Sequence, residues 1–210
     1  MANKYTFGKV PGIEEGDRFP DRRALREAGM HLNLQAGIDG NPSEGASSIV
    51  LNGGYVDDED LGDEIIYTGH GGNDPNTKRQ ISDQSWNASG NKALIVSEMK
   101  DLPVRVVRGS KHQTAFSPST GYQYGGLYWV MDHFEQIGRD GYKICRFRLE
   151  KVTNIQQANG QVNEDFPEFL GYSKHRKTSA ENITRNAHLA QSLKELYDYH
   201  CQICGTKLMI

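Results

Sequence analysis

The feature that most limits the fold is a series of short runs rich in β-branched and aromatic residues. Glycine and proline separate the runs, which cover residues 47–51, 64–68, 104–107, 126–131 and 142–149. Runs of this length between turn-forming residues are typical of strands in a small barrel or curled sheet. Helices are predicted at residues 21–29, where Asp21 can cap the start and Gly29 can follow the end, and at residues 87–100. The predicted class is α+β.

The chain divides by composition into one domain and an appendage. With 210 residues and 36% hydrophobic content, it can bury one good-sized core. We assign this core to residues 1–152. Residues 153–182 turn polar and lose periodicity, which predicts a linker. In residues 183–210, apolar side chains spaced by three and four predict an amphipathic helix that leads into a Cys-x-x-Cys-Gly sequence.

The cysteines and the lack of long apolar runs indicate the compartment. No run of 18 apolar residues occurs, and the N-terminus has no apolar stretch of the signal-peptide kind. We therefore expect a soluble, cytoplasmic protein without a membrane partner. Of the three cysteines, Cys201 and Cys204 are spaced for a metal or redox role in a reducing compartment. Cys145 lies in an apolar-alternating run and is expected in the core.

The net charge of −3 argues against a nucleic-acid partner until its distribution is considered. Residues 55–64 hold six acidic residues and no basic one, which leaves 21 of the 27 acidic residues against all 24 basic ones elsewhere. Outside this run the chain is therefore basic. Taken alone, the acidic run is typical of a solvated loop.

The neighbours of the acidic run favour a binding pocket for a flat ligand. Tyr55 and Tyr67 frame the run, and glycines stand beside each tyrosine. Glycine lets the backbone approach a ligand closely, aromatic faces stack on it, and a carboxylate accepts hydrogen bonds from an amino group. This combination suits a cytosine flipped out of a DNA duplex, an extrusion that costs a few kcal/mol. The alternative is that both tyrosines are simply core residues.

The order of several motifs makes the resemblance to one family specific. The motifs are Val10-Pro11-Gly12-Ile13 with Gly16-Asp17, Ala36-Gly37-Ile38, Gly53-Gly54-Tyr55-x-Asp57-Asp58-x-Asp60, Tyr67-Thr68-Gly69-x-Gly71-Gly72 and Pro103-Val104-Arg105-Val106-Val107-Arg108. With these motifs, residues 8–150 resemble an SRA (SET- and RING-associated, or YDG) domain. The resemblance implies a crescent-shaped, partly open β-barrel of the PUA-like type with flanking helices. It also implies that the domain flips 5-methylcytosine out of double-stranded DNA.

The resemblance assigns a modified-base pocket and two DNA-contacting loops. The pocket consists of Asn52, Gly53, Gly54, Tyr55, Asp58, Tyr67, Thr68 and Gly69. By resemblance the two tyrosines sandwich the base, Asp58 accepts from the cytosine amino group, and the Thr68 and Gly69 backbone lies on the same edge. Asp57, Glu59 and Asp60 receive no base contact and can equally form a solvated face. The loops contribute Gln35, which fills the hole left in the base stack, and Asn76, Thr77, Lys78 and Arg79.

Three positions depart from the family pattern. The second loop is one residue shorter than in animal relatives, so a merely solvated Lys78-Arg79 pair is the alternative there. The tripeptide behind the YDG name is Tyr124-Gly125-Gly126, without the aspartate. Asn52 stands where a small apolar residue faces the cytosine 5-substituent, and its amide could pair with a hydroxyl group. We therefore expect 5-hydroxymethylcytosine to bind at least as well as 5-methylcytosine, unless Asn52 turns outward or caps a turn.

The C-terminal Cys201-Gln202-Ile203-Cys204-Gly205 resembles the opening zinc knuckle of an HNH nuclease. Two thiolates make half of a structural Zn²⁺ site, which needs four ligands. An SRA domain followed by an HNH domain resembles bacterial modification-dependent restriction endonucleases. This resemblance implies a parent enzyme that uses Zn²⁺ and a divalent cation, Mg²⁺ or Mn²⁺. Because two nuclease sites are usually needed to cut both strands, we expect the parent to be a homodimer. We expect this chain to stop at the start of the HNH domain and to hold no catalytic residue of it.

Two other functions stay open. One is a binding module that reads modified DNA without catalysis. The other is a base-modifying or glycosylase enzyme, for which Asp58 is the one candidate catalytic residue; by resemblance Asp58 serves binding alone.

Overall fold

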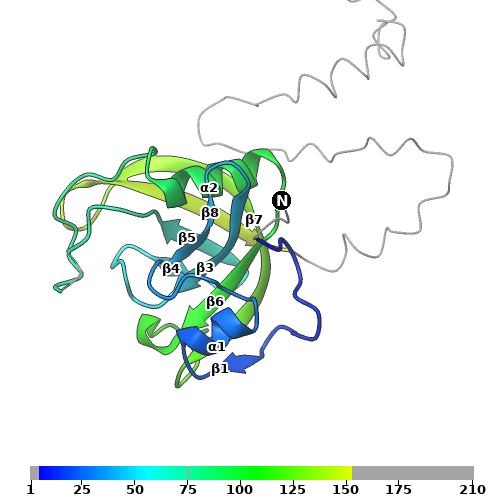
Figure 1. Ribbon diagram of the computed structural model, residues 1–210. Coiled ribbons are helices and arrows are strands. Elements are labelled where there is room, and N and C mark those ends of the chain that lie inside the picture. The colour runs from blue at the N-terminus through cyan, green and yellow to red at the C-terminus, as the bar shows by residue number, and fades with distance from the viewer. Residues whose placement is uncertain (1–4, 75, 153–210) are drawn as a thin grey trace, which may run out of the picture. The chain divides into compact units, whose positions relative to one another are not determined.

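The computed structural model describes residues 5–74 and 76–152, which form one mixed, eight-stranded sheet (Figure 1). The strand order is β2-β3-β6-β7-β8-β5-β4, and β1 pairs with β7. The bounds are β1 Arg18–Phe19, β2 Ile38–Asn41, β3 Gly45–Leu51, β4 Glu59–Asp60, β5 Glu64–Thr68, β6 Val104–Gly109, β7 Tyr122–Ile137 and β8 Lys143–Lys151. Strands β3 and β6 run parallel, and the other pairs are antiparallel.

The sheet curls so that its two halves face each other. In the strand order β3 and β5 are separated by β6, β7 and β8, yet Gly37, which leads into β2, lies against Tyr67 of β5. Bulges between Arg105 and Val107 of β6 and between Val130 and Asp132 of β7 interrupt the regular register. Bulges bend the strands that carry them. The predicted α+β class and partly open, curled sheet are confirmed.

Two helices cover parts of the sheet. Helix α1, Arg22–Glu27, begins at Asp21, whose Oδ1 accepts from the backbone N–H groups of Arg23 and Ala24 at 2.8 and 2.9 Å. Helix α2, Ser89–Met99, packs on β2, β3 and β7. Both helices lie inside the predicted ranges. A short 3-10 helix, η1 Ser110–His112, follows β6.

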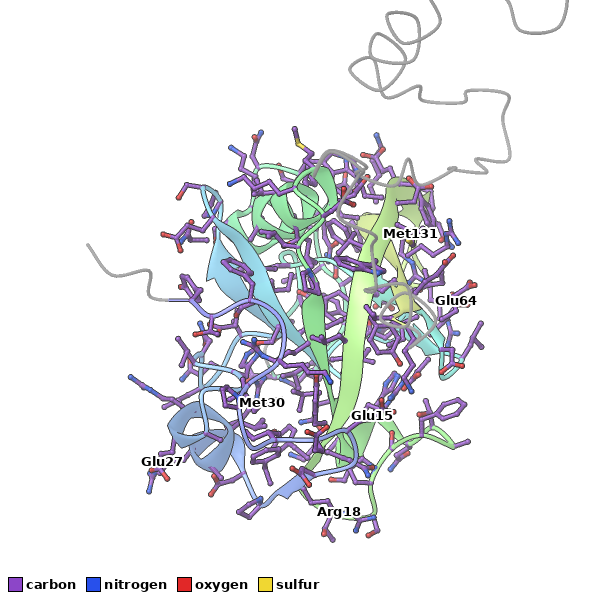
Figure 2. All side chains as sticks on the ribbon, turned by 90° about the vertical axis from the view of Figure 1, so that its right-hand side faces the viewer. Glu15, Arg18, Glu27, Met30, Glu64 and Met131 are labelled. Atoms are coloured by element: carbon purple, nitrogen blue, oxygen red, sulfur yellow. The ribbon has the colours of Figure 1, made fainter. Side chains whose placement is uncertain are left out.

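The core forms two clusters. The larger fills the curled sheet with side chains of β3, β5, β6, β7, β8 and α2, among them Ile49, Phe147 and Leu94. It also contains Cys145, which confirms the prediction for that residue. The smaller cluster lies under α1. Figure 2 shows Met30 of this cluster between the helix and the sheet, while Glu27 of the helix points away.

The acidic run is solvated only in part, because two of its carboxylates pair with buried arginines. Arg108 Nε and Nη2 donate to the two carboxylate oxygens of Asp60 at 2.7 and 2.9 Å, and both residues are buried. Asp57 is also buried and accepts from the backbone N–H of Arg139 at 3.0 Å. The solvated reading was therefore wrong for Asp57 and Asp60, while Glu59 stays exposed.

Arg108 also explains the missing aspartate of the YDG tripeptide. A Cβ atom built at Gly125 would lie 2.4 Å from Arg108 Nη1. The guanidinium therefore occupies the space that a side chain at position 125 would need. Its charge is met by Asp60 from another strand instead.

Strand β7 is longer than predicted, and three short strands were missed. It was predicted at residues 126–131 and extends over Tyr122–Ile137, while β1, β2 and β4 were not predicted. The predicted linker and C-terminal helix lie outside the described residues. Among residues 5–74 and 76–152, no helix is long and apolar enough to cross a membrane.

Replacement of Asp60 by Ala should lower the free energy of unfolding by about 3 to 5 kcal/mol, because it leaves the buried Arg108 guanidinium unpaired. Urea unfolding followed by circular dichroism measures this loss. Asp63→Ala is the matched control, since the side chain of Asp63 is 81% exposed and lies 3.6 Å from Lys151. That variant should lose less than about 1 kcal/mol. Equal losses in the two variants would show that the buried ion pair does not hold the acidic run.

Candidate nucleic-acid interface

A cavity of about 630 Å³ opens where the two halves of the curled sheet meet. Its walls come from the segment before β2, the loop after β3, strand β5 with the loop that follows it, and the β6–β7 connection. It is lined by Arg22, Gln35, Ala36, Gly37, Ile38, Val50, Asn52, Gly53, Gly54, Tyr55, Asp58, Tyr67, Gly69, His70, Asn73, Lys78 and Lys111. Seven of the eight predicted pocket residues are in this lining; the eighth, Thr68, is fully buried behind Asp58, to which its backbone N–H donates.

Both predicted tyrosines line the cavity, and each is fixed in place. Tyr67 is 3% exposed and belongs to the larger core cluster, so it is a core residue that also lines the cavity, and its stacking on a base stays a prediction. A Cβ atom at Gly37 would lie 2.6 Å from the Tyr67 hydroxyl oxygen, so only glycine fits there. Tyr55 is half-buried, and its hydroxyl accepts from the Gly71 backbone N–H at 3.0 Å. The cavity therefore has two rigid aromatic walls.

Asp58 is the carboxyl group of the cavity. Its Oδ1 accepts from the Thr68 backbone N–H at 2.8 Å. Burial raises the pKa of Asp58 to about 7, although the hydrogen bonds from Thr68 and the charge of Arg146 oppose the shift. Near neutral pH the group can therefore either hold a proton and donate it or accept hydrogen bonds with both oxygens.

Arg146 of β8 fastens the loop that carries Asp58 to the end of β5. Its side chain is buried, and its Nη1 donates to the Thr68 hydroxyl at 3.0 Å and to the Asp57 carbonyl oxygen. Nη2 donates to Glu59 at 2.7 Å. The residues on both sides of Asp58 are thus held by one guanidinium.

Buried side-chain amides hold the loop at residues 69–73. Asn91 of α2 is fully buried, and its Oδ1 accepts from the His70 backbone N–H at 2.6 Å. Gln84 Nε2 donates to the Gly69 carbonyl at 2.8 Å, and Asn73 Nδ2 donates to the Gly54 carbonyl at 2.6 Å. Sequence reasoning missed these amides, because nothing in the local pattern separates a buried amide from an exposed one.

Hydrogen bonds to the Ala36 carbonyl fix the loop that carries Gln35. Arg22 Nη2 donates to the Ala36 carbonyl at 3.0 Å. Burial lowers the pKa of His31 to about 3, so the ring is neutral. Its Nε2 donates to the same carbonyl at 3.0 Å, and its Nδ1 accepts from the Ser48 hydroxyl at 2.8 Å. Gln35 itself is exposed and lines the cavity, as a side chain that enters the base stack must.

The second predicted loop contributes Lys78 to the cavity. Lys78 has a φ of 62°, in the left-handed region. Arg79 instead pairs with Asp140 at 3.3 Å, and its side chain is 74% exposed. Asn76 and Thr77 are exposed and hydrogen-bond to the carboxylate of Asp74. The structure therefore brings Lys78 to the cavity and leaves the other three on the loop surface.

Asn52 lines the cavity but is already bonded at both ends. Its Nδ2 donates to the Tyr122 hydroxyl at 3.2 Å, and its Oδ1 accepts from the Lys111 backbone N–H at 3.2 Å. An amide has two N–H groups and two lone pairs on its oxygen, so each end keeps one further position. Contact with a 5-hydroxymethyl group is compatible with this arrangement and stays a prediction.

One group among the described residues has the composition of a metal site. Ligand atoms of Glu98, Asp132 and His133 lie within 4.8 Å of one another. These residues belong to α2 and β7 and do not line the cavity, and His133 Nδ1 donates to Glu98 at 2.6 Å. The predicted zinc ligands, Cys201 and Cys204, lie outside the described residues.

Comparison with known families identifies the fold that builds this cavity. The family profile described as "SAD/SRA domain" matches residues 6–155. The chain belongs to the SAD/SRA family. The SRA resemblance inferred from the motifs is confirmed.

Two proteins similar to this SRA chain come from a plant and a fungus. It is 40% identical over 159 residues to the histone-lysine N-methyltransferase family member SUVH2 of Arabidopsis thaliana, covering 71% of this chain and 24% of the relative. It is 40% identical over 163 residues to a UHRF1-like protein of Cryptococcus neoformans, covering 72% and 48%. The chain thus spans about a quarter to a half of the length of these two relatives.

The SRA chain is similar to the solved structures of a restriction endonuclease and of an SRA domain bound to DNA. The modification-dependent TagI restriction endonuclease superposes with a TM-score of 0.71 at 43% identity, covering 100% of this chain and 68% of that one. The SUVH5 SRA domain bound to fully hydroxymethylated CG DNA superposes with a TM-score of 0.60 at 38% identity, covering 70% of this chain and 94% of that one.

The raised pKa of Asp58 predicts a pH-dependent cost to stability. Between the ordinary value of 3.8 and about 7, the unfolded chain ionises this group while the folded chain keeps it protonated. The folded state then binds more protons, so stability falls as the pH rises through this window. Asp58→Asn should remove the cost, since an amide oxygen can still accept from Thr68. The variant should therefore gain melting temperature relative to the wild type as the pH rises from 4 to 8. A difference in melting temperature that stays constant over this range would contradict the raised pKa of Asp58.

Proposed function

We propose that the chain binds double-stranded DNA containing 5-methylcytosine or 5-hydroxymethylcytosine and holds the modified base, extruded from the duplex, in the cavity. The observation that carries this proposal is the meeting of Tyr55, Tyr67 and Asp58 on one cavity backed by Gly37. Related structures support it, since SUVH5 SRA was solved with fully hydroxymethylated and with fully methylated CG DNA.

The cavity offers the groups that a cytosine edge requires. Cytosine presents an amino donor and, beside it, a ring-nitrogen acceptor, and a protonated carboxyl group matches both. Asp58, whose pKa lies near neutrality, is able to take the protonated form. This property supports recognition of the cytosine edge by hydrogen bonds to both its amino group and its ring nitrogen.

The rigid walls reduce the cost of extrusion. Flipping a base costs a few kcal/mol, and stacking on an aromatic side chain returns about 1 to 3 kcal/mol. Tyr55 and Tyr67 are held by Gly71 and by core packing before any base enters. Since their side chains need no ordering on binding, more of the stacking energy can offset the flip.

We further propose that this chain is the recognition part of a modification-dependent DNA endonuclease of the HNH type. The TagI match supports this, because it extends over the whole chain and so reaches past the SRA domain. Cys201 and Cys204 would supply half of a structural Zn²⁺ site, and the nuclease would add Mg²⁺ or Mn²⁺ and act as a homodimer. A non-catalytic reader is the second candidate, favoured by the SUVH2 and UHRF1-like relatives.

Asp58→Ala should weaken binding to a modified duplex by about 1.5 to 3 kcal/mol, within the typical cost of leaving buried hydrogen-bonding groups of the base without a partner. Binding to the unmodified duplex should change little, because Asp58 meets only an extruded base. Fluorescence anisotropy with otherwise identical duplexes measures both affinities. Asp63→Ala, an exposed acid outside the cavity, is the control and should retain full discrimination. If Asp58→Ala discriminates as the wild type does, the pocket lies elsewhere.

The gene sequence downstream of Ile210 tests the nuclease proposal. An HNH endonuclease requires a second pair of zinc ligands and the His-Asn-His residues that bind the catalytic cation. Their presence, with cleavage of modified plasmid by the longer product in Mg²⁺ or Mn²⁺, supports the enzyme. A stop codon, or nicking by the 210-residue chain that a substitution within it abolishes, would refute this arrangement.

A further inference from the structure

Lys111 reaches the cavity from the connection between β6 and β7. It belongs to η1 and is exposed, and it lines the same cavity as Asp58 and the two tyrosines. Figure 1 shows this connection beside the loop that follows β3. Neither composition nor the family motifs singled out this residue.

The backbone of Lys111 is packed directly on the pocket loop. Its N–H donates to Asn52 Oδ1 at 3.2 Å, and a Cβ atom at Gly53 would lie 2.7 Å from its carbonyl oxygen. Gly109 approaches the same amide, since a Cβ atom there would lie 2.1 Å from Asn52 Oδ1. The other end of Asn52 is bonded to Tyr122 of β7. The hydrogen bonds of the Asn52 side chain thus fix the position of the Lys111 backbone relative to the cavity.

Two other cations line the cavity, and each has a different environment. Arg22 is half-buried and donates to backbone carbonyls of the Gln35 loop, so its guanidinium stabilises that loop. Lys78 lies on the loop predicted to enter a groove. Lys111 forms no ion pair within the described part of the chain. Its ammonium group is therefore available to an anion from outside.

We propose that Lys111 binds a phosphodiester group that flanks the extruded nucleotide, as a contact made only when the base occupies the cavity. This inference rests on the proposed base flipping. A nucleotide that rotates about its backbone carries its base into the cavity and leaves its phosphates at the rim. Each phosphate is an anion with strong acceptor oxygens, for which lysine is a suitable point charge. Because Lys111 adjoins the pocket loop, its contact favours the extruded state over general duplex binding.

The test is a chemical double-substitution cycle with the 210-residue chain. Fluorescence anisotropy compares wild type and Lys111→Ala on duplexes with one 5-methylcytosine. In two further duplexes, a neutral methylphosphonate replaces the phosphate immediately 5′ or immediately 3′ of that nucleotide. We expect Lys111→Ala to weaken binding to the normal modified duplex about three- to tenfold, with a smaller effect on the unmodified duplex. On the duplex that lacks the contacted charge, the substitution should have no further effect.

Controls separate this contact from general electrostatics. Lys92→Ala removes an exposed lysine of α2 that does not line the cavity, and its effect should be the same on all methylphosphonate duplexes. Lys111→Arg should retain most of the affinity, and thermal unfolding shows whether the variants are folded. Two results would overturn the Lys111 assignment alone. One is that Lys111→Ala weakens binding to both methylphosphonate duplexes as much as to the normal modified duplex. The other is that it weakens binding to modified and unmodified DNA equally. A wild type that binds both duplexes equally would overturn base recognition, and the Lys111 contact with it.

Discussion

The cavity depends on the guanidinium of Arg146, which ties two separate segments to one strand. From β8 it donates to the carbonyl of Asp57, to the carboxylate of Glu59 and to the hydroxyl of Thr68. The first two belong to the acidic run and the third ends β5. Asp58 lies between the fastened residues and bonds to Thr68 as well. Together with Arg108, which pairs with Asp60, this cation holds the acidic run against the sheet.

The same arrangement accounts for the charge of the sequence. A carboxyl-rich run beside a DNA-binding cavity would repel phosphates if it were solvated. Here Asp60 pairs with buried Arg108, Glu59 with Arg146, and Asp57 lies near Arg139 at 3.9 Å. The acids thus neutralise two buried arginines and one exposed arginine, and Asp58 is the carboxyl group that lines the cavity. Its burial costs stability, as is usual for groups whose pKa is adapted to a function.

Local sequence patterns predicted many of the helices and strands, but they did not predict how the sheet curls to form the cavity. Asp21 caps its helix as predicted, and β5 has the predicted bounds, because capping and strand formation depend on neighbouring residues. Strand β2 was missed because Asp39 and Gly40 look like turn residues. In the structure Asp39 is buried and accepts from the Leu32 backbone N–H, a partner that no local pattern reveals.

The cavity was predicted through ordered motifs rather than through geometry. Glycines beside Tyr55 and Tyr67 indicated the walls, because glycine lets the backbone approach a ligand closely. The glycine that Tyr67 itself requires is Gly37, which belongs to a different motif. Lys111 and Arg22 escaped prediction because a single basic residue in a loop or helix carries no pattern of its own. Long-range contacts with Asn52 and Ala36 bring them to the cavity. Asp57 and Asp60 were undecided for the same reason, because a charge run does not show which members find buried partners.

The most direct test is a binding titration of this chain against matched duplexes that differ at one cytosine. The three duplexes carry cytosine, 5-methylcytosine or 5-hydroxymethylcytosine at that position and are compared at one salt concentration, because phosphate contacts depend strongly on salt. We predict that both modified duplexes bind more tightly than the unmodified one and that 5-hydroxymethylcytosine binds at least as well as 5-methylcytosine. Equal affinity for all three duplexes would contradict recognition of a modified base in this cavity.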